Sequence, residues 1–219
     1  MYSLGNILTD FFISGINFLF AYWVLRATVL RQRKTFTVWF ALFFISVAFS
    51  GIAKGLGSMY PPEFSLENRV VEQLCYLILA ISGLASWNLG ARLVCAKKAR
   101  KNIYRFAYTL FGGLCCYITL VESNFFVVLI HNSIGLIFLL FSLVIQFYRK
   151  WDKEIAFGVL GIFTTFLALI VRQLAVGVDD AIMGLDIFFN SLSLFSSIMV
   201  YMAAKLLVSN EYKYSIKAY

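Results

Sequence analysis

The chain has 219 residues, of which 61% are hydrophobic and only 14% are charged, and its formal net charge is +8. A soluble domain is about half apolar and about one quarter charged, so this composition excludes an ordinary soluble protein and predicts an integral membrane protein. Lysine and arginine commonly flank membrane segments on the cytoplasmic side, which accounts for the positive charge without a nucleic-acid partner.

Seven apolar stretches are candidates for membrane helices, because a span needs about 20 mostly apolar residues. The stretches are continuous rather than alternating, which favours an all-α bundle over a barrel of strands. With two prolines and no Ser- or Gly-rich linker, we expect one seven-helix transmembrane domain over residues 1–219. In chain order, the helices are expected at about 9–26, 36–57, 70–94, 104–121, 125–147, 155–176 and 187–208.

The basic residues predict how this multi-pass bundle is oriented. Apart from Lys54, Arg69 and Arg172, every lysine and arginine lies in or beside the first, third and fifth loops or near the C-terminal end. An excess of lysine and arginine marks the cytoplasmic side. We therefore expect the N-terminus outside and the C-terminus in the cytoplasm, although the pattern does not say which membrane holds the protein.

Polar side chains also recur within the apolar stretches, and six helices contribute them at a similar depth in the outer half. Ionisable groups in a span cost about 2.5–3.5 kcal/mol on insertion scales, and they usually face the bundle interior and mark a site. Their shared depth predicts a polar pocket in the outer half of the bundle. These residues are Asp10, Asn17, Lys54, Glu72, Gln73, His131, Asn132, Arg172, Gln173, Asp186 and Asn190.

Each of these residues also has a purely structural interpretation. Asp10, Arg172 and Asp186 lie near helix ends, where they can cap the helix or extend to the interface. Lys54 can extend outward in the same way, and His131, the single histidine, can be a hydrogen-bonded structural group. If Lys54 instead faces inward, its charge requires a partner, for which Glu72 is the first candidate.

Three segments resemble the pattern of a known group of enzymes, the seven-helix membrane hydrolases related to alkaline ceramidases and adiponectin receptors. The segments are Ser50-Gly-Ile-Ala-Lys54, Glu72 and Asn190-Ser-Leu-Ser-Leu194. That superfamily carries Ser-x-x-x-His on helix 2, an aspartate early in helix 3 and His-x-x-x-His on helix 7, and its three histidines hold zinc. The resemblance implies the seven-helix fold and the outside N-terminus.

The same resemblance implies that the metal has been lost. Ser50 matches the serine and Glu72 replaces the aspartate, whereas Lys54, Asn190 and Leu194 stand at the three histidine positions. A catalytic zinc site needs about three protein ligands and an open position for water, and neither an ammonium group nor leucine is a ligand. We therefore expect no metal and no other cofactor. The four cysteines also match neither a disulfide framework nor a zinc motif.

The sequence thus favours a non-catalytic protein, in effect a pseudoenzyme, that binds a lipid-like or amphiphilic ligand in the outer-half pocket. Membrane lipids are the expected partners, with a membrane-protein partner or a homo-oligomer as further options. The candidate ligand-pocket residues are Ser50, Lys54, Glu72, His131, Arg172, Asp186 and Asn190, and no catalytic residue is assigned.

Several alternatives stay open. An accessory or scaffold subunit of a larger membrane complex is one, because Gly51-x-x-x-Gly55 permits close helix approach within or between chains. A membrane hydrolase acting on a lipid amide or ester is another, with Ser50 activated by Lys54. A retinal protein is disfavoured because helix 7 lacks a central lysine, and a transporter because no continuous polar path crosses the bundle.

Overall fold

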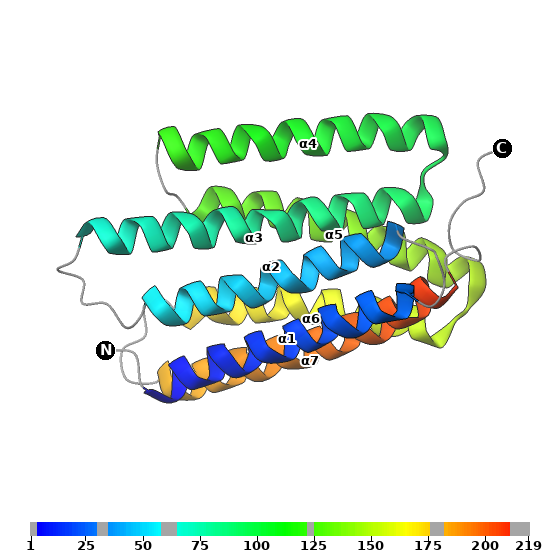
Figure 1. Ribbon diagram of the computed structural model, residues 1–219. Coiled ribbons are helices and arrows are strands. Elements are labelled where there is room, and N and C mark those ends of the chain that lie inside the picture. Colours follow the sequence, from blue (N-terminus) through cyan, green and yellow to red (C-terminus); the bar gives the residue numbers. More distant parts are fainter. Residues whose placement is uncertain (1–3, 30–34, 58–64, 122–124, 176–181, 211–219) are drawn as a thin grey trace.

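The computed structural model describes residues 4–29, 35–57, 65–121, 125–175 and 182–210, and these form seven α-helices in an antiparallel succession (Figure 1). The first helix begins at the end of the bundle opposite to the end at which the seventh helix finishes (Figure 1). The helices are α1 (Leu4–Val29), α2 (Thr35–Gly57), α3 (Ser65–Val94), α4 (Lys97–Leu120), α5 (Phe125–Lys150), α6 (Lys153–Ala175) and α7 (Ile182–Ser209).

The all-helical, multi-pass architecture agrees with the sequence prediction. Six of these helices are long and apolar enough to cross a membrane, and in α6 the described apolar part, Ile155–Ala168, is shorter. Some helices extend beyond the predicted apolar stretches: α4 begins at Lys97 rather than at residue 104. The helix therefore includes the basic segment that precedes the apolar stretch. Hydropathy does not locate such an end, because helical backbone hydrogen bonding does not require apolar side chains.

The helices pack in neighbouring pairs, and α4 lies at the edge of the bundle. The most extensive contacts join α6 with α7, α1 with α2, α3 with α5, and α2 with α3. The fourth helix packs mainly on α3, on the side away from α1 and α7 (Figure 1). Its buried residues are Ala107, Leu114 and Ile118, which lie on one stripe of the helix. Although α4 connects α3 to α5 along the chain, it does not lie between them, and α3 and α5 are in direct contact.

Close approach of helices depends on glycines at the contacts. A Cβ on Gly135 of α5 would lie 2.7 Å from the carbonyl oxygen of Gly83 on α3, and one on Gly161 of α6 would lie 2.9 Å from the amide nitrogen of Val200 on α7. A Cβ on Gly51 would collide with Ser14 Oγ of α1. Gly51 thus serves a contact within the chain, which is one of the two roles expected for the Gly51-x-x-x-Gly55 segment.

Two amides fix how α3 and α5 lie against each other. Asn132 of α5 donates its side-chain N–H to the Leu79 carbonyl of α3 at 3.0 Å, and Gln146 donates likewise to the Leu93 carbonyl. The two donors are the same number of residues apart as the two acceptors. The helices therefore run parallel with matched register over about four turns.

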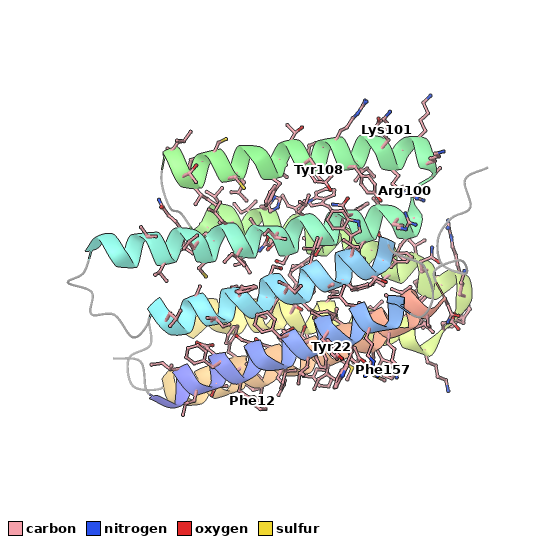
Figure 2. All side chains as sticks on the ribbon, in the orientation of Figure 1. Phe12, Tyr22, Arg100, Lys101, Tyr108 and Phe157 are labelled. Atoms are coloured by element: carbon pink, nitrogen blue, oxygen red, sulfur yellow. The ribbon has the colours of Figure 1, made fainter. Side chains whose placement is uncertain are left out.

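The main core lies at the level between these two contacts, where it includes Leu89 of α3 and Leu139 of α5, and it is rich in aromatic rings. Phe44 is fully buried, and its ring centroid lies 5.7 Å from that of Phe20 and 6.5 Å from that of Tyr201. Phe20 and Tyr201 are stacked at 4.4 Å, which joins α1 to α7. The outer surface is apolar as well: Phe12 and Tyr22 of α1 lie exposed on it (Figure 2), as a surface facing lipid requires.

One end of the bundle is basic. Lys97, Lys98 and Lys101 at the start of α4 are exposed, and Figure 2 shows Lys101 extending away from the bundle. Arg92 covers the Phe36 ring at 5.6 Å, and Arg100 donates to the carbonyl of Cys95 at 3.0 Å. Both arginines thus take part in packing at this end. Arg92 of α3 contacts α2, and Arg100 of α4 is hydrogen-bonded to the residue that follows α3.

Candidate functional site

A cavity of about 210 Å³ lies among α1, α2, α3, α5, α6 and α7. It occupies the half of the bundle away from the basic end, where α1 begins and where α2 and α6 end. No residue of α4 is among the described residues of its wall. The polar side chains of that wall are Asp10, Ser14, Ser50, Ser82, Asn132, Thr165, Asn190, Ser193, Ser196 and Ser197.

One face of α7 forms the longest stretch of the wall. Asn190, Ser193, Ser197 and Val200 all line the cavity, and their spacing of three or four residues places them on one stripe of the helix. At 1.5 Å per residue this stripe is about 15 Å long, roughly half of a bilayer's hydrocarbon core. The cavity is therefore deep, and polar side chains of α7 line it over that length.

Most hydroxyl groups whose contacts are known are already committed as donors. Ser14 donates to the Asp10 carbonyl at 2.7 Å, and Ser82 donates to the Leu79 carbonyl at 2.7 Å. Such bonds to the preceding turn are the usual way in which a helix accommodates a serine. They leave the oxygen lone pairs, rather than the proton, for anything inside the cavity.

Thr165 and Ser196 form a small network between α6 and α7. Both hydroxyls lie within hydrogen-bonding distance of the Gly161 carbonyl, at 3.0 Å and 2.9 Å, and they are 2.6 Å from each other. Two hydroxyls have only two protons, and the network uses both of them. This pair, too, offers the cavity acceptors rather than donors.

Two buried amides line the cavity with one atom unpaired. Asn132 and Asn190 are each only 6% exposed. The Asn132 N–H is used by Leu79, whereas the Oδ1 atoms of both residues have no hydrogen-bond partner among the residues the structure describes. A buried polar atom without a partner costs about 1–3 kcal/mol, so native proteins rarely retain one without a reason.

The remaining wall is apolar. Ile13, Phe43, Val47, Leu136 and Val200 line the cavity beside the polar groups. A concave site with an apolar wall and a few convergent polar atoms is the usual form of a small-molecule site. An amphiphile matches both parts of the wall.

The structure separates the residues that the sequence grouped into one pocket. Ser50 and Asn190 line the cavity, and Ser50 Oγ lies 3.8 Å from Cys75 Sγ of α3. Glu72 is exposed and accepts a hydrogen bond from the hydroxyl of Tyr76, one turn further along α3. His131 is buried, with its ring 6.5 Å from that of Phe111 on α4, and it is not among the described residues of the cavity wall.

Three predicted pocket residues lie outside the described side chains. These are Lys54, Arg172 and Asp186, whose backbones belong to α2, α6 and α7. The orientation of Lys54 therefore stays an open prediction. Among the side chains that are described, no three from histidine, cysteine, aspartate and glutamate gather as a metal site would require, and none of the four cysteines forms a disulfide.

Apart from Ser50, the serines of the cavity are residues that sequence reasoning did not select. Ser193, Ser196 and Ser197 follow Asn190 at helical spacing, which is a signal that one face of α7 is polar. The hydroxyl of a serine in a membrane helix can, however, donate to a backbone carbonyl one turn earlier in the same helix. The sequence alone therefore does not distinguish a serine that lines the cavity from one that faces lipid.

The structure is a bundle of apolar helices with polar side chains buried around a cavity. These features are typical of the multi-pass helical membrane proteins. Within this class the chain belongs to a family of unknown function (DUF6962), whose model matches residues 6–208. The match runs from the first turn of α1 to the last turn of α7. No curated protein and no solved structure matches the chain significantly.

Proposed function

We propose that all seven helices span a membrane, with the N-terminus outside and the C-terminus in the cytoplasm. The gathering of exposed lysines at one end of the bundle supports this orientation, because lysine and arginine are enriched on the cytoplasmic side. The cavity then lies in the outer half of the membrane.

Labelling of single cysteines at the two ends of α4 tests the orientation. Lys98→Cys and Val121→Cys place thiols at exposed positions on opposite ends of this helix. In a background without the four native cysteines, a membrane-impermeant maleimide should label Val121→Cys in intact cells and Lys98→Cys only after permeabilisation. The native Cys95 is a poor reporter, because burial raises the pKa of its thiol and Arg100 only partly opposes this. The reverse labelling pattern would overturn the proposed orientation.

We also propose that the protein binds a small amphiphilic molecule in the cavity without transforming it. The observation that carries this proposal is the cavity of about 210 Å³, whose wall joins apolar side chains with hydroxyl groups and two buried amide residues, Asn132 and Asn190. Polar groups of the ligand would meet the hydroxyl and amide groups of the wall, and its apolar part would follow the wall that includes Ile13 and Phe43.

A non-catalytic role agrees with the chemistry of the described wall. Asp10 is the one titratable side chain among the described lining residues. A serine nucleophile requires an adjacent base, whereas Ser14, Ser82 and Ser196 are hydrogen-bonded to backbone carbonyls. The resemblance to seven-helix membrane hydrolases stays a prediction, and it too implies a protein without the zinc ligands.

Replacement of Asn190 tests the binding site. Asn190→Leu removes the amide at nearly constant size, and we expect the co-purifying amphiphile, measured by mass spectrometry after extraction, to fall about tenfold or more. Asn88→Leu is the matched control, since Asn88 is fully buried with an unpartnered Oδ1 but lies outside the described wall. If both variants retain the same amphiphile as the parent, or if the parent carries none and takes up none, the proposal fails.

An accessory role in a membrane complex is the second candidate, and the edge position of α4 favours it. Gly112 and Gly113 on this helix are exposed, and a Cβ on either would meet no atom within 4 Å. Small residues on a lipid-facing surface permit close approach of another helix. A stoichiometric protein partner in gentle detergent, together with an empty cavity, would favour this role over ligand binding.

A further inference from the structure

We infer that the exposed face of α4 binds an anionic phospholipid, with the headgroup at the basic start of the helix and the acyl chains along the apolar remainder. This face is separate from the cavity, because no residue of α4 is among the described residues of the cavity wall. Lipid binding on α4 and ligand binding in the cavity can therefore fail independently of each other.

Exposed basic side chains follow one stripe of α4. Lys98, Lys101 and Arg105 are all exposed, and their spacing of three and four residues places them on one face of the helix over two turns. Figure 2 shows Lys101 extending away from the bundle. Arg100 belongs to the same segment but donates to the Cys95 carbonyl at 3.0 Å, at the connection to α3. The basic stripe therefore consists of Lys98, Lys101 and Arg105.

Nothing on α4 itself balances the charge of this stripe. The helix has no aspartate or glutamate from Lys97 to Leu120, and it begins after Ala96, whose side chain cannot accept from the first-turn amides. The helix dipole places a partial positive charge at this end, so that basic residues in the first turns are unfavourable unless an anion is close by. The phosphate of a lipid headgroup supplies such an anion.

The exposed face continues as a surface that suits acyl chains. Phe106 and Tyr108 flank the end of the basic stripe and are 56% and 46% exposed. Further along the same face lies Gly112, where a Cβ would meet no atom within 4 Å, so the surface is open there. Charge and apolar surface thus follow each other along one face of one helix, as the headgroup and chains do in a phospholipid.

The position of α4 favours a lipid over a soluble anion as the occupant. The helix is long and apolar enough to cross a membrane, yet only 17% of this span is buried inside the protein. It lies at the edge of the bundle and packs mainly on α3 (Figure 1). A soluble anion would contact the basic stripe alone, whereas a phospholipid would cover the basic stripe and the adjoining apolar surface.

Competition between two lipids, read by native mass spectrometry of the purified protein, tests the inference. Dioleoylphosphatidylglycerol and dioleoylphosphatidylcholine are added in equal amounts, because they share their acyl chains and differ in the charge of the headgroup. We expect the protein to retain the anionic lipid about tenfold over the neutral one. Higher ionic strength should lower this preference, since exposed charges are screened by salt.

Variants locate the preference on the basic stripe. Lys98→Gln/Lys101→Gln should remove most of it, and Lys98→Arg/Lys101→Arg should keep it. The matched control is Arg149→Gln/Lys153→Gln, which removes the same charge from exposed positions where α5 ends and α6 begins. Those positions lie at the same end of the bundle but outside α4, so the control should retain the preference.

Three results would overturn the inference. The first is equal retention of the two lipids, or an equal loss of preference in Lys98→Gln/Lys101→Gln and in the control. The second is displacement of the lipid by the water-soluble headgroup glycerophosphoglycerol at the same concentration, because the site would then take soluble anions without using the apolar face. The third is a stoichiometric protein partner that Lys98→Gln/Lys101→Gln releases, because α4 would then be a protein interface.

Discussion

Phe44→Ala should destabilise the bundle by about 3 kcal/mol. Phe44 of α2 is fully buried, and its ring meets those of Phe20, Phe43 and Tyr201. Loss of a buried phenylalanine costs about 3–5 kcal/mol in soluble proteins, as lost transfer free energy plus the cavity left behind. We expect the lower end here, because a side chain released into lipid loses contacts without being exposed to water.

The measurement is the free energy of unfolding in mixed micelles, with Phe141→Ala as the matched control. Phe141 lies on α5 and is 63% exposed, so its replacement changes a lipid contact and should alter stability by less than about 1 kcal/mol. Equal losses of stability in the two variants would contradict the observed packing of α2 against α1 and α7.

Gly135→Ala should destabilise the contact between α3 and α5. The added Cβ would lie 2.7 Å from the Gly83 carbonyl oxygen and 3.1 Å from Trp87 Cδ1. The nearer atom belongs to the backbone of α3, so relief requires a shift of a whole helix. Overpacking of this kind typically costs about 1–3 kcal/mol, and the same unfolding measurement should detect it.

Gly112→Ala is the matched control for this effect and should have the opposite sign. Gly112 is exposed on α4, and a Cβ there meets no atom within 4 Å. Alanine is favoured over glycine inside a helix by about 0.5–1 kcal/mol, so this variant should be unchanged or slightly more stable. A loss of stability in Gly112→Ala as large as that in Gly135→Ala would show that glycine replacement itself, and not the α3–α5 contact, is responsible.

The helices were predictable because their signal is local. A long apolar stretch must satisfy its backbone internally, and the predicted 36–57 and 70–94 correspond to Thr35–Gly57 and Ser65–Val94. The largest difference from a predicted boundary is at the start of α4, which lies in a basic segment that hydropathy does not register as part of the helix. A polar region in the outer half was also expected, since the depth of a residue along a span can be read from the sequence.

The members of the site were not predictable in the same way. Asn190 and Ser50 line the cavity, whereas Glu72, at a similar expected depth, is exposed and bonded to Tyr76. Depth follows from position along the chain, but the face that a helix turns inward follows from its neighbours. His131 illustrates this, because direct packing of α5 on α3 directs it to that interface.

The sequence by itself determined that this protein is a bundle of apolar helices with a basic end and with polar side chains in the opposite half. The tertiary structure alone decided which polar side chains share a cavity and which of their atoms remain unpaired. The reason is physical: hydropathy and charge are sums over local residues, whereas a cavity forms between helices distant in sequence, whose rotation is set by contacts such as Gly83 with Gly135 and Asn132 with Leu79.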